Sequence, residues 1–258
     1  MTTYAANWYL EDGSVTVNAD NSGQTVTQGS TSTPDEAPVI TQRGSSAETS
    51  NTITINASEN ATANVTISNV NIDTSSAAIA TSGKGNVNIE LDGTNTLKSG
   101  VDHAGLEKNS DGNQGKLTIT DENENGKLIA TGGDGAAGIG GGLYGDGNDI
   151  TITGGEITAT GGDCGAGIGG GFSAGGKNIT IAGGKVTAIG GTNGAGIGGG
   201  FFGDGNDITI AGGKVTATGG DYGAGIGGGN HGEGKNITIT DGCLLYTSPS
   251  PRDRTRSR

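Results

Sequence analysis

Apolar and polar residues alternate in short segments along residues 126–242. One unit of this part contains Ile179-Thr180-Ile181, Val186-Thr187-Ala188 and Ala195-Gly196-Ile197. Alternation with a period of two, in segments rich in Ile, Val and Thr, is typical of half-buried β-strands. Pairs of glycines and short polar segments lie between the three segments, as turns require. The pattern therefore predicts three strands and three turns in each unit.

This unit repeats at a fixed interval of 29 residues, because the isoleucine of the segment GIGGG recurs at Ile139, Ile168, Ile197 and Ile226. Self-similarity at such a period indicates a solenoid or an array. One coil cannot bury its own apolar side chains, whereas a stack of coils aligns them in continuous inner columns. We expect one column at the GIGGG isoleucines and two others at Ile150, Ile179, Ile208, Ile237 and at Ile157, Val186, Val215.

Upstream, the same strand pattern continues with less regular spacing. The segments NVTI, NVNIEL and KLTIT resemble the later NITI strands, and they predict a column of Val65, Val87, Leu117 and Ile150 at intervals of 22, 30 and 33 residues. The insertion DENEN at 121–125 accounts for the longest interval. We therefore expect a strand-rich cap at 1–50, irregular coils at 51–125 and regular coils at 126–242.

The composition supports a solenoid over a conventional globular core. The chain has 55 Gly, and only 3% of its residues are aromatic and 30% hydrophobic. Low-complexity disorder is the alternative that such a composition favours. The strict period of 29 residues argues against disorder, because it supplies a repeated apolar surface that stacking can bury.

The last sixteen residues, 243–258, differ from the rest of the chain. Their first eleven letters, CLLYTSPSPRD, resemble a translated sequencing adapter, and the segment contains no glycine. We expect it not to belong to the natural protein, and we expect the natural chain to continue past Gly242. The segment holds four Arg and one Asp, so the net charge is −13 for the whole chain and −16 for residues 1–242.

The acidic charge argues against nucleic acid and anionic membranes as partners, because both require a basic surface. No apolar stretch approaches the roughly 18 residues of a membrane span, so no membrane insertion is expected. The first residues show no signal-peptide pattern. Without Cys243, Cys164 is a single cysteine, which excludes an intramolecular disulfide.

Aromatic residues are scarce, and the five in the regular coils all lie beside the GIGGG segment: Tyr144, Phe172, Phe201, Phe202 and Tyr222. Their rings could stack on sugars along one edge, or they could shield a corner of the core. The outward positions of the neighbouring strand are glycines, among them Gly167, Gly196 and Gly225. We predict that these glycines form a flat, bare face that binds a ligand together with the rings.

Two GDGND segments are candidate calcium sites, with carboxylates at Asp146, Asp149, Asp204 and Asp207. Hard cations prefer such oxygen ligands. The alternative is a ladder of charges, in which Lys177 and Lys235 of the alternate coils neutralise the aspartates. The repeated threonines, such as Thr151 and Thr180, are first of all good strand formers, and an ice-binding array is a weaker alternative.

Candidate catalytic residues are few. Lys185, Lys214 and Glu156 share one column, where a surface ladder of charges explains them. His103 and His231 are not repeated, and Cys164 has no histidine predicted beside it, so a Cys-His nucleophile is not expected. We predict that the protein is not an enzyme.

The tandem ITITGGxVTATGGxxGAGIGGG units, preceded by NVTISNVNI and LDGTNTL, resemble bacterial surface proteins that carry carbohydrate-binding domains of the pectate-lyase-like β-helix type. The resemblance implies a right-handed parallel β-helix, secretion, and binding of plant or host polysaccharide, in some cases with calcium. We therefore predict a noncatalytic extracellular module that binds polysaccharide or a cell-surface glycan. The alternatives are a structural spacer or adhesin stalk without glycan binding, and a calcium-dependent polysaccharide lyase.

Overall fold

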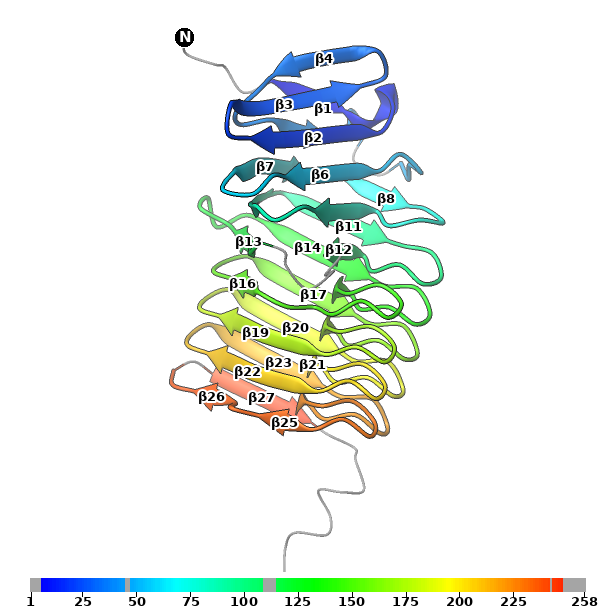
Figure 1. The fold of residues 1–258 in the computed structure, drawn as a ribbon, viewed down its shortest axis with the longest axis vertical. Helices are drawn as coiled ribbons and strands as arrows, with labels where there is room; N and C mark the ends of the chain where they lie inside the picture. The colour runs from blue at the N-terminus through cyan, green and yellow to red at the C-terminus, as the bar shows by residue number, and fades with distance from the viewer. Residues whose placement is uncertain (1–5, 45–46, 109–114, 242, 248–258) are drawn as a thin grey trace, which may run out of the picture.

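The computed structural model describes residues 6–44, 47–108, 115–241 and 243–247. The described strands form three sheets, named A, B and C, and most pairs within them are parallel. Successive coils stack along the long axis of the molecule, so the chain runs from one end of the stack to the other (Figure 1). Apart from the 3₁₀ turn Leu10–Asp12, the described residues contain no helix, and therefore none that could cross a membrane.

Each regular coil contributes one strand to sheet A, then one to sheet C, then one to sheet B. Sheet A contains β1 (Asn7–Tyr9), β5 (Val39–Thr41), β7 (Thr62–Ser68), β10 (Asn86–Asp92), β13 (Leu117–Thr120), β16 (Ile150–Ile152), β19 (Gly176–Ile181), β22 (Gly205–Ile210), β25 (Gly234–Lys235) and β26 (Thr238–Ile239). Sheet C contains β8 (Asn71–Asp73), β11 (Thr94–Lys98), β14 (Lys127–Thr131), β17 (Glu156–Thr160), β20 (Lys185–Ile189), β23 (Lys214–Thr218) and β27 (Cys243–Thr247). Sheet B contains β2 (Val15–Asp20), β3 (Gly23–Gln28), β4 (Thr31–Pro34), β6 (Ile53–Ala57), β9 (Ile79–Ser82), β12 (Leu106–Lys108), β15 (Ile139–Gly140), β18 (Ile168–Gly169), β21 (Ile197–Gly198) and β24 (Ile226–Gly227).

The stacked apolar columns predicted for the regular coils are confirmed by the strand register, except at Ile237. That residue is 37% exposed, because no later strand of sheet A covers this end of the stack among the described residues. Each isoleucine or valine pairs with its counterpart 29 residues further along: Ile150, Ile179 and Ile208 in sheet A, Ile157, Val186 and Val215 in sheet C, and Ile139, Ile168, Ile197 and Ile226 in sheet B. The buried apolar residues from Trp8 to Ala217 form one continuous cluster. Burying one such side chain contributes about 1.5–3 kcal/mol, which explains how coils rich in glycine hold together.

Upstream, one predicted register is wrong. Val65 pairs with Ile89, and Ala63 is the residue that lies opposite Val87. The similar letters of NVTI and NVNI suggested an alignment two residues away from the real one. Because side chains alternate with a period of two, this error leaves Val65 on the buried face. The other steps of the column are confirmed, since Val87 pairs with Leu117 and Leu117 with Ile150.

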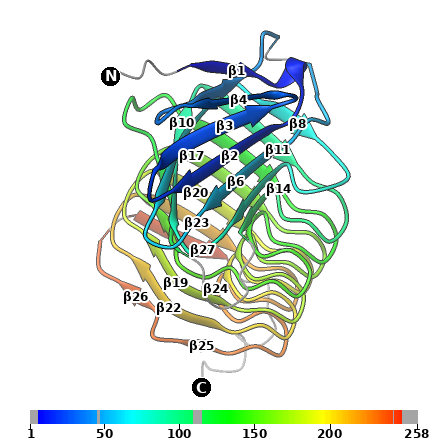
Figure 2. The same ribbon diagram turned by 45° about the horizontal axis from the view of Figure 1, so that its top comes forward.

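The stack begins with a cap whose hairpins close its first end (Figure 2). Strands β2, β3 and β4 pair antiparallel, and β2 also pairs in parallel with β6 of the first coil. The single Trp8 lies here, and its indole Nε1 donates a 2.9 Å hydrogen bond to the buried carboxylate of Asp35. The cap thus covers the core and satisfies its own buried polar groups.

At the other end, β27 belongs to the segment that resembles an adapter. Cys243 lies opposite Lys214 in a parallel pair of β27 with β23, so residues 243–247 continue the stack by one strand. The rest of that segment, 248–258, lies outside the described residues.

Candidate functional site

A row of rings crosses four successive coils at the B–A loops, which connect each strand of sheet B to the next strand of sheet A. The ring centroids of Tyr144 and Phe172 lie 5.5 Å apart, and those of Phe172 and Phe201 lie 5.6 Å apart. Phe201 and Phe202 are stacked at 3.9 Å, and the ring of His231 is stacked on Phe202 at 5.2 Å. We call these five residues the aromatic row.

The backbone of the B–A loops turns Tyr144 and Phe202 toward solvent. Tyr144, Phe202 and His231 have φ of 59°, 60° and 66°, in the left-handed region, where a non-glycine residue is uncommon. Tyr144 is 68% exposed and Phe202 is 52% exposed. Rings of this size in water mark a surface that another molecule can cover.

Phe172 and Phe201 instead tie the B–A loops to the C–B turns, which connect sheet C to sheet B. The amide of Phe172 donates to the carbonyl oxygen of Gly135 in the preceding coil, and the amide of Phe201 donates to that of Cys164, both at 2.8 Å. Both rings are half-buried. They therefore combine the two roles that the sequence left open, since they shield a corner and carry the exposed rings.

Sequence reasoning placed four members of the aromatic row correctly and missed the fifth. His231 was noted only as a histidine that is not repeated, although its spacing of 29 residues from Phe202 was the signal that could have found it. Tyr222 lies elsewhere, in a C–B turn, where it occupies the position of Cys164 and Asn193 in earlier coils. It is 54% exposed, but it has no ring partner within the described chain.

The expected bare face at Gly167, Gly196 and Gly225 is wrong, because all three glycines are buried. A Cβ atom on Gly167 would lie 2.5 Å from the amide nitrogen of Ile189, and one on Gly196 would lie 2.6 Å from the carbonyl oxygen of Gly225. Glycine is required here because the coils approach one another at backbone distance. These residues serve the packing between coils and present no surface to a ligand.

The aspartates of the two GDGND segments each accept a hydrogen bond from the coil that follows. The pairs are Gly175 N–H to Asp146 at 2.9 Å, Glu233 N–H to Asp204 at 2.8 Å, Asn178 Nδ2 to Asp149 at 3.0 Å and Asn236 Nδ2 to Asp207 at 2.8 Å. The Lys177 ammonium lies 4.0 Å from the carboxylate of Asp207, as the charge-ladder alternative expects. Calcium at these aspartates stays a prediction.

Within the described ranges, three side chains that could ligate a metal come together at one place. The ligand atoms of Asp134, Asp163 and Cys164 all lie within 4.8 Å of one another. Burial raises the pKa of the Cys164 thiol, and the negative charges of Asp163 and Asp134 raise it further. The thiol is therefore held in its protonated form, which is a poor nucleophile and a poor ligand.

Comparison with known proteins agrees with this geometry. The Beta helix repeat family matches residues 124–143, 150–172, 179–201 and 208–230. The last three matched segments each begin at a buried isoleucine of sheet A and end in a B–A loop. The family repeat therefore follows the coils of the structure. The chain is a parallel β-helix protein. No curated protein and no solved structure matches it.

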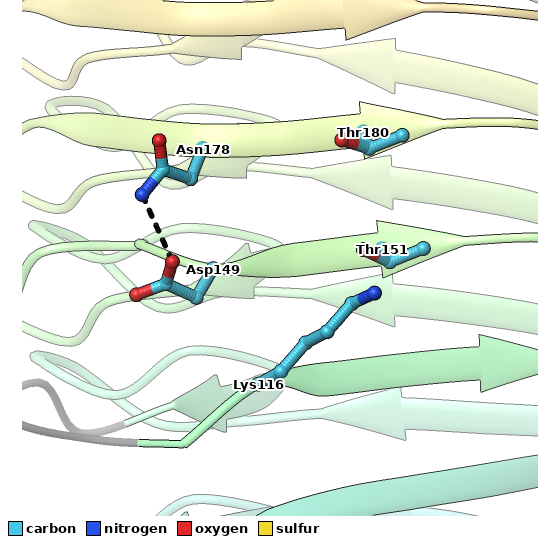
Figure 3. A pocket seen from close by; sticks show the side chains of 5 residues that line it. All are labelled: Lys116, Asp149, Thr151, Asn178 and Thr180. Atoms are coloured by element: carbon cyan, nitrogen blue, oxygen red, sulfur yellow. Dashed lines mark hydrogen bonds between the residues drawn. The ribbon is translucent and has the colours of Figure 1, made fainter.

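The β-helix also carries a polar depression on the outer face of sheet A (Figure 3). It is lined by Lys116, Asp149, Thr151, Asn178 and Thr180. Asn178 donates a hydrogen bond to Asp149 of the preceding coil, and Lys116 extends beneath Thr151. The threonines belong to a row in register, since Thr151 pairs with Thr118 and Thr180. The predicted threonine row of sheet A is thus confirmed as a strand-forming ladder.

The candidate catalytic groups of the β-helix form two separate local pairs. Lys185 Nζ and Glu156 Oε1 form an exposed ion pair at 2.8 Å on sheet C. His103 Nδ1 lies 3.0 Å from Glu107 Oε2 in an earlier coil. Each pair is therefore a local contact on a different part of the stack.

One buried group was missed by sequence reasoning. Lys108, at the end of β12, is only 2% exposed. Its ammonium nitrogen has no hydrogen-bond partner among the described residues. Burial lowers the pKa of Lys108, and the charge of Asp149 opposes that shift. Nothing in the local sequence GLEKN signals that this lysine faces inward.

Proposed function

We propose that this β-helix binds a polysaccharide chain along the aromatic row and catalyses no reaction on it. The observation that carries the proposal is the continuity of the row over four coils, with Tyr144 and Phe202 more than half exposed. Only 3% of the chain is aromatic, so a gathering of rings at one edge is not explained by composition. Aromatic rings supply large, rigid apolar surfaces, which suit the apolar faces of sugars.

The spacing of the coils suits a linear polymer better than a single sugar. Strands in neighbouring coils lie about 4.8 Å apart, so the aromatic row repeats its contact at short, regular steps along the stack. Several weak contacts to one polymer add in binding free energy, because later contacts form at high effective concentration. A row of modest ring contacts can thus hold a long chain without a deep pocket.

The proposed location is outside the cell. This part of the proposal is supported by the resemblance of the tandem GAGIGGG units to bacterial surface proteins. Polysaccharides are abundant on cell surfaces and in the material around them, so a binding module of this kind would meet its ligand there.

The test uses the two rings that are most exposed, because their removal least disturbs the core. We expect the double variant Tyr144→Ala, Phe202→Ala to lose at least about tenfold in affinity, which corresponds to about 1.4 kcal/mol. Binding would be measured by depletion onto a panel of insoluble polysaccharides and by affinity electrophoresis with soluble ones. The matched control is Tyr222→Ala, which removes an equally exposed ring from outside the row and should keep parental binding.

Two results would count against the site. Parental affinity in the double variant, or an equal loss in Tyr222→Ala, would show that the aromatic row is not the contact. If the parent protein binds no polysaccharide of the panel, the second candidate function is favoured: a structural spacer. The observation behind that candidate is the large buried cluster that extends from Trp8 to Ala217 and makes the stack continuous.

A further inference from the structure

The C–B turns place exposed carboxylates beside the aromatic row. Asp134, Asp163 and Asp221 occupy the same position in three of four successive turns, whose other member carries Thr192, and all three are exposed. The residues that follow the first two, Gly135 and Cys164, are those whose carbonyl oxygens hold the ring-bearing loops at 2.8 Å. One side of the aromatic row is therefore acidic.

Acidic residues also follow the rings within the B–A loops themselves. Asp146, Asp204 and Glu233 lie two residues after the position of Tyr144, Phe202 and His231 in the B–A loops. Lys235 pairs with Glu233 at 2.6 Å and compensates that charge.

Fixed cations are lacking in the segments that surround the rings. The C–B turns 132–138, 161–167, 190–196 and 219–225 contain no Lys or Arg, and neither do the B–A loops 141–149, 170–175, 199–204 and 228–233. A carboxylate oxygen of Asp134 lies within 4.8 Å of one of Asp163. The whole chain adds a net charge of −13. A polyanion bound on the rings would be repelled by these negative charges within the screening length, which is about 8 Å at physiological salt.

We infer that the aromatic row selects neutral polysaccharides and disfavours polymers that carry carboxylate or sulfate groups. This inference rests on the proposed function and names the ligand class of the same site. The flanking carboxylates repel anionic groups, whereas they accept strong, charge-assisted hydrogen bonds from the hydroxyl groups of neutral sugars. The same residues thus favour one class of polymer and oppose the other.

The experiment compares polymers that share a backbone and differ in charge. The probes are hydroxyethylcellulose with carboxymethylcellulose, and methyl-esterified homogalacturonan with its free acid. We expect the neutral member of a pair to bind at least about tenfold more tightly at about 0.01 M salt, where charges act over about 30 Å. The difference should narrow at about 1 M salt, where screening reduces that length to about 3 Å.

A matched pair of variants assigns the effect to the local carboxylates. The double variant Asp134→Asn, Asp163→Asn should reduce the difference in affinity between the neutral and the charged polymer. Glu59→Gln, Glu122→Gln removes the same charge from exposed turns of the irregular coils, and it should leave the difference as in the parent. Equal narrowing in both double variants would overturn the assignment to the row.

The outcomes also separate this inference from the proposed function. Equal or tighter binding of the charged polymers at low salt overturns the inference and keeps the polysaccharide site. Failure of the parent to bind either member of any pair overturns both.

Discussion

The irregular coils within residues 51–125 and the regular coils from residue 126 onward build the same three sheets, but they hold their turns in different ways. In the irregular coils, buried polar side chains connect one coil to the next. Asn95, which is fully buried, accepts from the amide of Val70 at 3.2 Å and donates to the carbonyl oxygen of Lys127 at 3.2 Å. Ser99 likewise bridges two backbone groups, at Ala78 and Ala104.

In the regular coils, the backbone itself makes these connections. The amide of Gly190 donates to the carbonyl oxygen of Thr218 at 2.8 Å, and that of Gly191 donates to Gly165 at 3.0 Å. Because glycine has no side chain, adjacent turns approach closely and satisfy each other directly. These glycine turns therefore need no side chain to connect them, and rings can occupy the B–A loops without disturbing the stack.

The largest expected effect comes from adding one methyl group to a regular coil. We expect Gly167→Ala to destabilise the protein by at least about 3 kcal/mol, because the new Cβ meets a backbone atom of the next coil, which no rotamer change can relieve. Chemical unfolding followed by circular dichroism would measure the loss. Gly44→Ala is the control, since a Cβ there meets nothing within 4 Å. Similar stability of both variants would contradict the backbone account of the regular coils.

The next effect belongs to the irregular coils. We expect Asn95→Ala to lower the free energy of unfolding by about 3 kcal/mol, because the buried amide of Val70 loses its acceptor and the carbonyl oxygens of Asp92 and Lys127 each lose one donor. The same unfolding measurement applies. Asn88→Ala removes only an exposed hydrogen bond to Asn64 and should change stability by less than about 0.5 kcal/mol. Equal losses in both variants would mean that Asn95 does not hold its turns in this way.

The difference between the regions explains what the sequence could predict. Where glycines and backbone hydrogen bonds form the turns, every coil has the same length. The alignment of the apolar columns from Ile139 onward could therefore be predicted from the sequence. Where particular side chains hold turns of varied length, the spacing between coils is not constant. Val65 was therefore predicted to pair with Val87, two residues away from its true partner Ile89.

The site was less predictable than the fold, because burial depends on the neighbouring coil. A position in a loop or turn looks the same in sequence whether it faces water, as at Phe202, or the backbone of the next coil, as at Gly167. The inward amine of Lys108 was hidden for the same reason. The spacing of 29 residues between Phe202 and His231 was visible in the sequence. Histidine is polar, however, so residue type alone did not indicate that it continues a row of hydrophobic rings.

Lys108 lies in the irregular coils, at the end of β12, and its replacement should raise stability. We expect Lys108→Met to increase the free energy of unfolding at neutral pH by about 1–2 kcal/mol, because methionine keeps the buried carbons and removes an amine that has no hydrogen-bond partner among the described residues. Burial lowers the pKa of Lys108 below its ordinary value of 10.5. The unfolded chain therefore binds this proton more tightly, so the parent gains stability as the pH rises toward 10.5.

The pH dependence provides the check on that assignment. The advantage of Lys108→Met over the parent should shrink between neutral pH and about pH 10, as measured by urea unfolding at both values. Lys116→Met, which removes a lysine from the sheet surface near Asp149, is the control and should show no such trend. A variant that is less stable than the parent at every pH would show that the buried amine has a partner that stabilises it.

The smallest effect is expected on the outer face of the regular coils, at the ion pair of Glu156 and Lys185. Both side chains are about half exposed, and exposed pairs contribute little because water and salt screen them. Hydrogen bonding and the charge of Lys185 lower the pKa of Glu156 below 4.5. Whatever stability the pair contributes is therefore present above that value and lost as the pH falls through the lowered pKa. We expect Glu156→Gln to melt within error of the parent at neutral pH, at low and at high salt. A loss as large as that of Asn95→Ala would show that side chains, and not the backbone, hold the regular coils together.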